Sequence, residues 1–66
     1  MKFGELEVVK TTVSFPDEGI EKDEIGTIVI AFTIPYEAYE VEFADHNGVT
    51  RAMFPILPEH LERVWP

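Results

Sequence analysis

The sequence predicts an all-β domain of five short strands that bend into a small barrel, with one short helical turn before the last strand. Apolar residues recur with a period close to 2 in several runs and with the helical period of 3.6 convincingly in none, which favours strands. The pair Asn47-Gly48 is typical of a tight hairpin turn. At 66 residues the chain is expected to form one domain, residues 1–66, with a small core and marginal stability.

The first two strands are predicted over residues 6–13 and 26–34. The first is rich in Val and Thr and is followed by turn-forming residues at 15–19. In the polar loop 20–24, Ile20 is the single apolar residue, and we expect it to be buried as an anchor. Residues 26–34 are apolar on both faces apart from two threonines. We therefore expect this strand to be buried on both sides, at the centre of the sheet.

The third strand carries the clearest alternation in the sequence, over residues 38–44. Tyr39, Val41 and Phe43 point to one side and Glu40 and Glu42 to the other. The pattern predicts a half-buried strand whose solvent side is acidic.

A hairpin turn is predicted next, because Asn and Gly tolerate the positive φ that both central positions of such a turn require. Residues 49–54 should then return antiparallel to the third strand. The outward residue of this fourth strand, Thr50 or Arg51, is expected to lie near Glu40 or Glu42.

The closing segment contains two prolines that limit its structure. Pro55 predicts the end of the fourth strand or a bulge, because proline cannot donate to a sheet ladder. Pro58 suits the first position of a helix. We expect a single helical turn here and then a short fifth strand over residues 62–65.

The net charge of −8 is concentrated in two short segments. Residues 17–24 hold five acids and Lys22, and residues 37–45 hold four acids and no base, so each has a net charge of −4, while the charges elsewhere cancel. Two interpretations remain open: a solvated polar surface that keeps a small domain soluble, or a negative face for a basic partner. Nucleic acid is disfavoured as a partner, because only five Lys and Arg are available to neutralise phosphates.

The sequence contains little that could perform catalysis. Ser14 is the only serine and lies at a strand end, where a hydroxyl usually satisfies a turn, and His46 and His60 have no partner at metal-ligand spacing. Residues 17–24 do not fit the calcium-loop pattern. We therefore predict no catalytic residue, no metal site and no cofactor.

No membrane association is predicted, because the longest nearly uncharged stretch, residues 25–36, is far shorter than the roughly 20 apolar residues that span a bilayer. The N-terminus lacks the apolar stretch of a signal peptide. The chain has no cysteine, which fits a reducing compartment. We expect a cytoplasmic protein.

The order of these motifs resembles a family of short, mostly bacterial, uncharacterised proteins known as the domain of unknown function 4926. The resemblance covers roughly residues 5–65 and is most specific at Gly26-Thr27-Ile28-Val29, Tyr39-Glu40-Val41-Glu42-Phe43 and Leu57-Pro58-Glu59-His60-Leu61. It implies an SH3-like barrel and no established activity. Phe54-Pro55-Ile56 departs from the pattern and leaves the end of the fourth strand open.

A looser similarity connects the chain to the signalling SH3 domains, which bind proline-rich peptides in an aromatic groove beside an acidic loop. Tyr36, Tyr39, Trp65, Pro35 and Pro55, together with the acidic residues 17–24, match that composition. The Ala-Leu-Tyr-Asp-Tyr and Trp-Trp elements of those domains are absent.

The leading functional hypothesis is an acidic protein-interaction module that contacts a basic protein, in its concrete form an immunity protein or antitoxin that masks a toxin. One acidic patch would consist of Glu40, Glu42 and Asp45, with Tyr36 as an aromatic anchor. A second patch would consist of Asp17, Glu18, Asp23 and Glu24.

The rival hypothesis is a structural or accessory subunit that forms homo-oligomers through apolar surface, without catalysis. Phe3, Tyr36, Phe54, Ile56 and Trp65 together exceed what so small a core is expected to hide, and an unpaired edge strand could join a neighbour.

Overall fold

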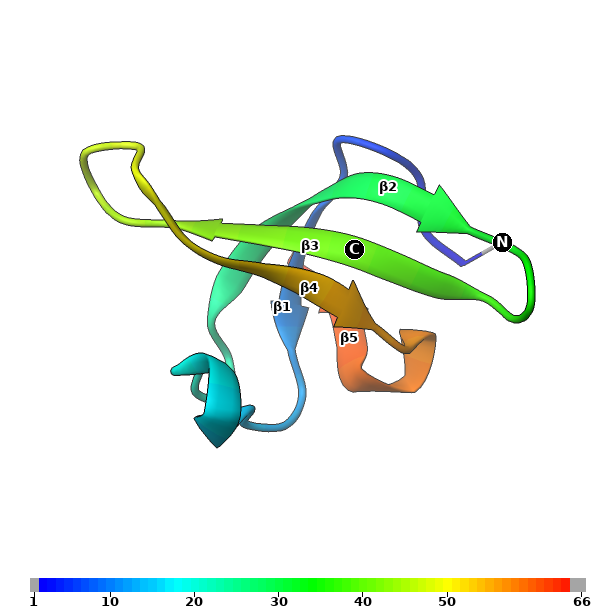
Figure 1. Ribbon diagram of the computed structural model, residues 1–66, viewed down its shortest axis with the longest axis horizontal. Helices are drawn as coiled ribbons and strands as arrows, with labels where there is room; N and C mark the ends of the chain where they lie inside the picture. Colours follow the sequence, from blue (N-terminus) through cyan, green and yellow to red (C-terminus); the bar gives the residue numbers. More distant parts are fainter. Residues whose placement is uncertain (1, 65–66) are drawn as a thin grey trace.

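The computed structural model describes residues 2–64, which form one antiparallel sheet of five strands in the order β4-β3-β2-β1-β5 (Figure 1). Two short 3₁₀ turns, η1 and η2, complete the structure. In chain order the elements are β1 (Val8–Thr11), η1 (Pro16–Glu18), β2 (Ile25–Phe32), β3 (Ala38–Ala44), β4 (Thr50–Ile56), η2 (Pro58–His60) and β5 (Leu61–Arg63).

The predicted fold class is confirmed: the protein is all-β, with five strands and one helical turn immediately before the last. The sheet is strongly bent, so that β1 and β5 turn away from the β2–β3–β4 layer (Figure 1). Within the described residues the sheet does not close, since β4 and β5 are its two edges. Residues from all five strands, from the N-terminal segment and from the loop before β2 form one core, consisting of Phe3, Val9, Ile20, Ile28, Tyr39, Val41, Phe43, Ile56 and Leu61.

The prediction that β2 is buried on both sides is wrong. Gly26 and Ile28 are buried, whereas Ile25 and Ile30 are exposed. The ladder with β3 shifts register between Ile28 and Ile30, which is the signature of a β-bulge. The strand is central in strand order, but only one of its faces is covered.

Gly26 permits the close approach of β2 to the core face of β3. A Cβ atom added at this position would lie 2.6 Å from Cγ1 of Val41 and 2.9 Å from the backbone oxygen of Glu42. Only a residue without a side chain fits here, and the tight packing holds the two central strands together.

The β3 strand has the predicted residues, and its two faces are as predicted. Tyr39, Val41 and Phe43 are buried in the core. Glu40 and Glu42 lie on the opposite face and are half-buried.

The hairpin between β3 and β4 is present, but its turn is not the predicted one. Gly48 has the left-handed φ of +82°, whereas Asn47 does not have a positive φ. The loop instead closes around Asp45, whose carbonyl accepts the Gly48 N–H at 2.9 Å. The pairing of β3 with β4 shifts by one residue between Phe43 and Ala44, so the loop differs in length from the predicted two-residue turn while the rest of the strand register is unchanged.

The β4 strand runs two residues beyond its predicted end and includes Pro55. Tyr39 is opposite Ile56 and Glu40 is opposite Pro55. The proline is tolerated because β4 is an edge strand, where one side of the backbone has no ladder to complete.

The β1 strand is shorter than predicted, because the chain bends into the acidic loop at Thr11. The buried Thr11 hydroxyl donates to the Glu21 carbonyl at 3.0 Å, and the Thr11 amide donates to the Glu24 carbonyl. Ile20 is 1% exposed, which confirms that it anchors this loop. The loop is therefore held at both of its ends.

At the C-terminal end, Pro58 opens the predicted helical turn and β5 follows directly. The β5 strand begins at Leu61, one residue before the predicted 62–65, and pairs with β1. Trp65 lies outside the described residues. No helix in the described part of the chain is long and apolar enough to cross a membrane.

Candidate functional site

The outer face of the β2–β3–β4 layer carries two carboxylates, Glu40 and Glu42, that form no ion pair within residues 2–64. The strand register places Ile30 and Pro55 on either side of Glu40, and Thr27 and Met53 on either side of Glu42. The two glutamates are two residues apart on one strand, so their Cα atoms are roughly 6.5–7 Å apart. We call these six residues the outer face.

Exposed apolar side chains flank these carboxylates. Ile30 is 43% exposed on β2, and Met53 is 52% exposed on β4. The outer face therefore combines two negative charges with two flexible or branched apolar groups. A surface of this kind suits a partner with cationic and apolar side chains.

Of the two β4 residues expected near Glu40 or Glu42, Thr50 makes the contact and Arg51 pairs elsewhere. The Arg51 guanidinium forms an ion pair with Glu24 in the loop before β2. Thr50 does lie where expected, and its hydroxyl donates to the Glu42 carboxylate. Because Arg51 is engaged by Glu24, the outer face keeps its negative charge.

Within residues 2–64, two other basic residues also form ion pairs. Lys10 Nζ lies 3.3 Å from Glu62, and Arg63 Nε lies 2.5 Å from Glu7. Both pairs are on the β1–β5 side of the sheet. Neither cation is available to Glu40 or Glu42.

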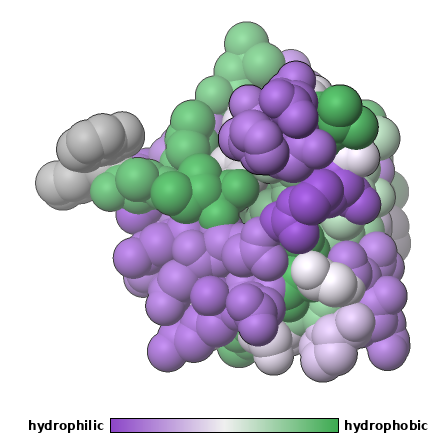
Figure 2. Space-filling view, turned by 90° about the vertical axis from the view of Figure 1, so that its left-hand side faces the viewer, coloured by the Kyte–Doolittle hydropathy of each residue, from purple (hydrophilic) through white to green (hydrophobic). Residues whose placement is uncertain are grey.

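The second predicted patch lies on a different part of the molecule. Asp17 and Glu18 are exposed on η1, below the sheet and apart from the hairpin loop (Figure 1). Asp23 is exposed in the same loop, whereas Glu24 is taken up by Arg51. The side of the molecule with the hairpin and η1 has large hydrophilic areas and also a hydrophobic patch (Figure 2). The two acidic segments therefore form two surfaces.

Asp45 has a structural role in the hairpin. Its Oδ1 accepts the N–H groups of Asn47 at 2.8 Å and Val49 at 3.0 Å. A side chain that closes its own turn in this way is not free to reorient toward a partner.

We expect Asp45→Ala to destabilise the protein by about 1 kcal/mol, because two backbone donors lose their acceptor. Asp45→Asn keeps an acceptor oxygen and should retain most of the stability. Urea unfolding followed by circular dichroism measures both variants. Equal stability of Asp45→Ala and the parent protein would contradict a role in the turn.

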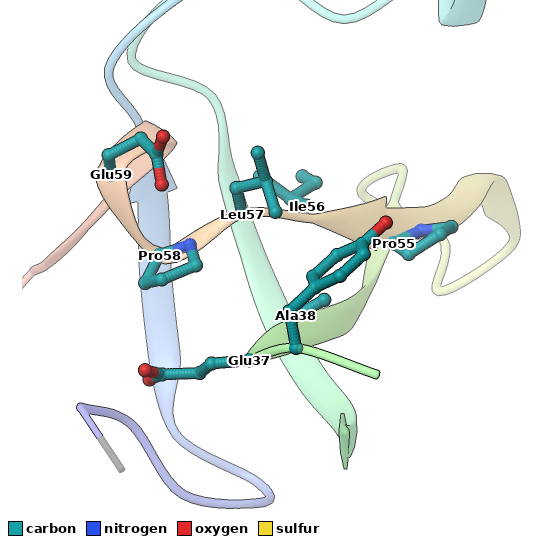
Figure 3. Close-up of a pocket in the computed structure, with 8 residues that line it drawn as sticks. Glu37, Ala38, Pro55, Ile56, Leu57, Pro58 and Glu59 are labelled. Carbon is teal, nitrogen blue, oxygen red and sulfur yellow. The ribbon is translucent and has the colours of Figure 1, made fainter. Parts of the chain in front are cut away.

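A groove at the far end of the same strands was not predicted from the sequence. It has a volume of about 470 Å³ and lies between residues 36–38, where the chain enters β3, and residues 55–59, where it leaves β4 and enters η2 (Figure 3). Tyr36 belongs to its wall and is 62% exposed. The predicted anchor is therefore accessible, but at this groove.

A hydrogen-bonded cluster attaches the N-terminal segment beside this groove. The buried Tyr39 hydroxyl accepts the N–H groups of Lys2 and Phe3, each at 3.0 Å, and donates to the Glu37 carboxylate. The hydrogen bond from Tyr39, together with that from the Lys2 amide, lowers the pKa of Glu37. Burial, followed by the bond to Glu37, raises the pKa of Tyr39.

Ser14, His46 and His60, the residues considered for catalysis or metal binding, lie in different parts of the structure. Ser14 lines a second pocket, of about 460 Å³, with Arg51 and Glu24 beside the acidic loop. His60 packs its ring against Phe15, with 6.0 Å between centroids, and His46 is exposed at the hairpin. Over residues 2–64, no group of three or more His, Cys, Asp or Glu side chains could hold a metal ion.

The fold and these surfaces define a class: a small acidic all-β domain with a carboxylate-bearing sheet face and an apolar groove beside it. The chain belongs to the family described as a domain of unknown function, DUF4926, whose model matches residues 5–63. The resemblance found in the sequence is thus confirmed. A search of curated proteins finds no match, and a search of solved structures finds none either.

Proposed function

We propose that this protein is a protein-interaction module whose outer face binds a basic protein. The observation that carries the proposal is that Arg51 pairs with Glu24, while Glu40 and Glu42 form no ion pair in the described part of the chain. The protein acts by binding, with no chemical step of its own. An immunity protein or antitoxin that masks a basic toxin is the concrete form of this function, and it suits a cytoplasmic protein.

The two kinds of side chain on the outer face contribute differently to binding. A cation 4 Å from an exposed carboxylate gains only about 1 kcal/mol in water. The carboxylates therefore mainly steer the encounter and set its orientation. Burial of Ile30 and Met53, at about 25 cal/mol per Å² of apolar area, supplies the affinity.

A homo-oligomer is the alternative, supported by the exposed apolar side chains and the two sheet edges. The outer face is a poor surface for it. A two-fold symmetric dimer places the same patch of both copies together, which would bring four carboxylates into one interface. Phe3 and Ile56, which were counted as apolar surface, are buried in the core.

Charge reversal tests the proposal. Glu40→Lys/Glu42→Lys and Asp17→Lys/Glu18→Lys each change the net charge from −8 by the same amount, so they separate the location of the charge from its total. We expect tagged parent protein to capture a basic protein from lysate of its source cells. The outer-face variant should lose that protein and the η1 variant should keep it, with melting temperatures close to the parent value.

Capture that survives Glu40→Lys/Glu42→Lys would contradict the proposal for the outer face. If only Asp17→Lys/Glu18→Lys fails to capture the basic protein, the binding surface is at η1. Sedimentation at micromolar concentration tests the alternative, since a dimer that persists at high salt would favour oligomerisation through apolar surface.

A further inference from the structure

We infer that the groove between residues 36–38 and 55–59 binds an extended peptide segment in which proline or other apolar residues lie beside lysine or arginine. The function proposed above uses the outer face, so this is a second binding surface. Pro55 stands at the boundary of the two.

The shape and lining of the groove suit a few consecutive side chains of a peptide. Its volume of about 470 Å³ is in the usual range for ligand sites. Ile56 and Ala38 are buried at its base, while Tyr36 and Pro55 are exposed. A firm apolar floor with an accessible aromatic ring is the surface on which proline and leucine side chains pack well.

The backbone of the groove favours a polyproline II ligand over an added β-strand. An edge strand such as β4 ordinarily offers free N–H and C=O groups to another strand. Pro55 and Pro58 have no N–H, which interrupts the donor row along this part of the edge. A polyproline II segment needs no such ladder, because it is recognised through its side chains and its own backbone stays solvated.

The charges at one end of the groove specify the basic part of the ligand. In Figure 3 the carboxylates of Glu37 and Glu59 lie at the end of the groove away from Pro55, with Pro58 between them. Hydrogen bonds from the Tyr39 hydroxyl and from the Lys2 amide, the latter at 2.9 Å, lower the pKa of Glu37. Glu59 is exposed and forms no ion pair within residues 2–64. The two carboxylates make this end of the groove negative, which favours a guanidinium or ammonium group of the ligand there.

The placement of the ligand's apolar and basic residues follows from this arrangement. Its apolar residues pack near Tyr36 and Pro55, and its cation reaches past Pro58. The acidic loop 17–24, which the sequence suggested as the acidic side of such a groove, does not line it. Tyr39, another residue of that comparison, is buried in the core.

Selection of short random peptides displayed on phage tests the inference. The library is depleted on Tyr36→Ser/Glu59→Lys and then selected on the parent protein. We expect enriched peptides to carry prolines or leucines beside arginine or lysine. One enriched peptide is then synthesised with a fluorescent label, and its affinity is measured by polarisation.

We expect Tyr36→Ala to weaken this peptide about tenfold or more, as loss of a central aromatic anchor does. Glu59→Gln should weaken it by a smaller factor. Met53→Ala is the matched control, because it truncates an apolar side chain of similar exposure outside the groove, and it should have no effect. Tyr36 is exposed, so its removal should leave the melting temperature unchanged.

The inference is overturned if no sequence is enriched, if the enriched peptides are acidic, or if Tyr36→Ala binds as tightly as the parent protein. Glu40→Lys/Glu42→Lys separates the two surfaces. If that variant loses the peptide while Tyr36→Ala keeps it, the peptide binds the outer face, and the groove inference fails while the proposed function stands.

Discussion

Gly26→Ala is expected to destabilise the protein by about 1–3 kcal/mol, the cost of overpacking a well-packed core. The new methyl group would lie 2.6 Å from Cγ1 of Val41, 2.9 Å from the Glu42 carbonyl oxygen and 3.0 Å from Cδ1 of Phe43. Two of these atoms belong to buried side chains and one to the backbone of the central strand pair. The strands must separate to make room, and no flexible side-chain end is available to move instead.

Such a loss is large for this chain, because natural domains are stable by only roughly 0.05–0.15 kcal/mol per residue. Gly4→Ala is the matched control, since nothing lies within 4 Å of a Cβ atom added at that position. Urea unfolding of both variants measures the difference. A Gly26→Ala variant as stable as Gly4→Ala would contradict the close packing of β2 on β3.

Tyr39→Phe is the second substitution with a large expected effect, a loss of about 1–3 kcal/mol. It removes the acceptor of the Phe3 and Lys2 amides, and the Phe3 amide is buried. The Phe3 ring, packed edge-on against Tyr39 at 5.3 Å between centroids, would lose its fixed position. Proteolysis and hydrogen exchange of the N-terminal segment should therefore become faster.

The pH dependence of stability gives this substitution a specific signature. The pKa of Tyr39 is raised in the folded protein, so its contribution is complete below its ordinary value of 10.0 and is lost as the pH rises through the folded value. The pKa of Glu37 is lowered, so its contribution is present above its ordinary value of 4.5 and is lost as the pH falls through the folded value. In a plot of folding stability against pH, Tyr39→Phe should remove most of the loss of stability at alkaline pH and reduce the loss at acid pH.

Tyr36→Phe is the control, because it removes a hydroxyl from an exposed ring and should change stability by no more than about 0.5 kcal/mol. Stability measured from acid to alkaline pH compares the three proteins. If Tyr39→Phe loses as much stability at alkaline pH as the parent protein, the buried hydroxyl does not couple folding to pH.

The parts of the fold that follow from local pattern were predictable from the sequence. The β3 strand could be placed residue by residue because apolar and acidic side chains alternate along it, and Ile20 could be identified as an anchor because no other apolar residue is near it in the loop. The β2 strand could not be assigned a buried face. A run of apolar residues has no alternation to read, so the exposure of Ile30 depends on what the rest of the chain covers.

The candidate site was predictable only in part, because long-range contacts decide it. Glu40 and Glu42 face outward as their alternation requires. The partner of Arg51 was not predictable, since Glu24 reaches it from another loop. The groove depends on the pairing of Tyr39 with Ile56. A two-residue turn at Asn47-Gly48 would already imply that pairing, so a signal for the groove was present in the sequence.

The association rate with the captured basic protein, measured against ionic strength, tests the role of the outer face most directly. For the parent protein we predict a rate that falls at least tenfold between about 0.01 M and about 1 M salt, as the screening length shrinks from roughly 30 Å to roughly 3 Å. Glu40→Lys/Glu42→Lys should associate slowly at low salt and depend little on salt. Equal rates and equal salt dependence in the two proteins would contradict the account.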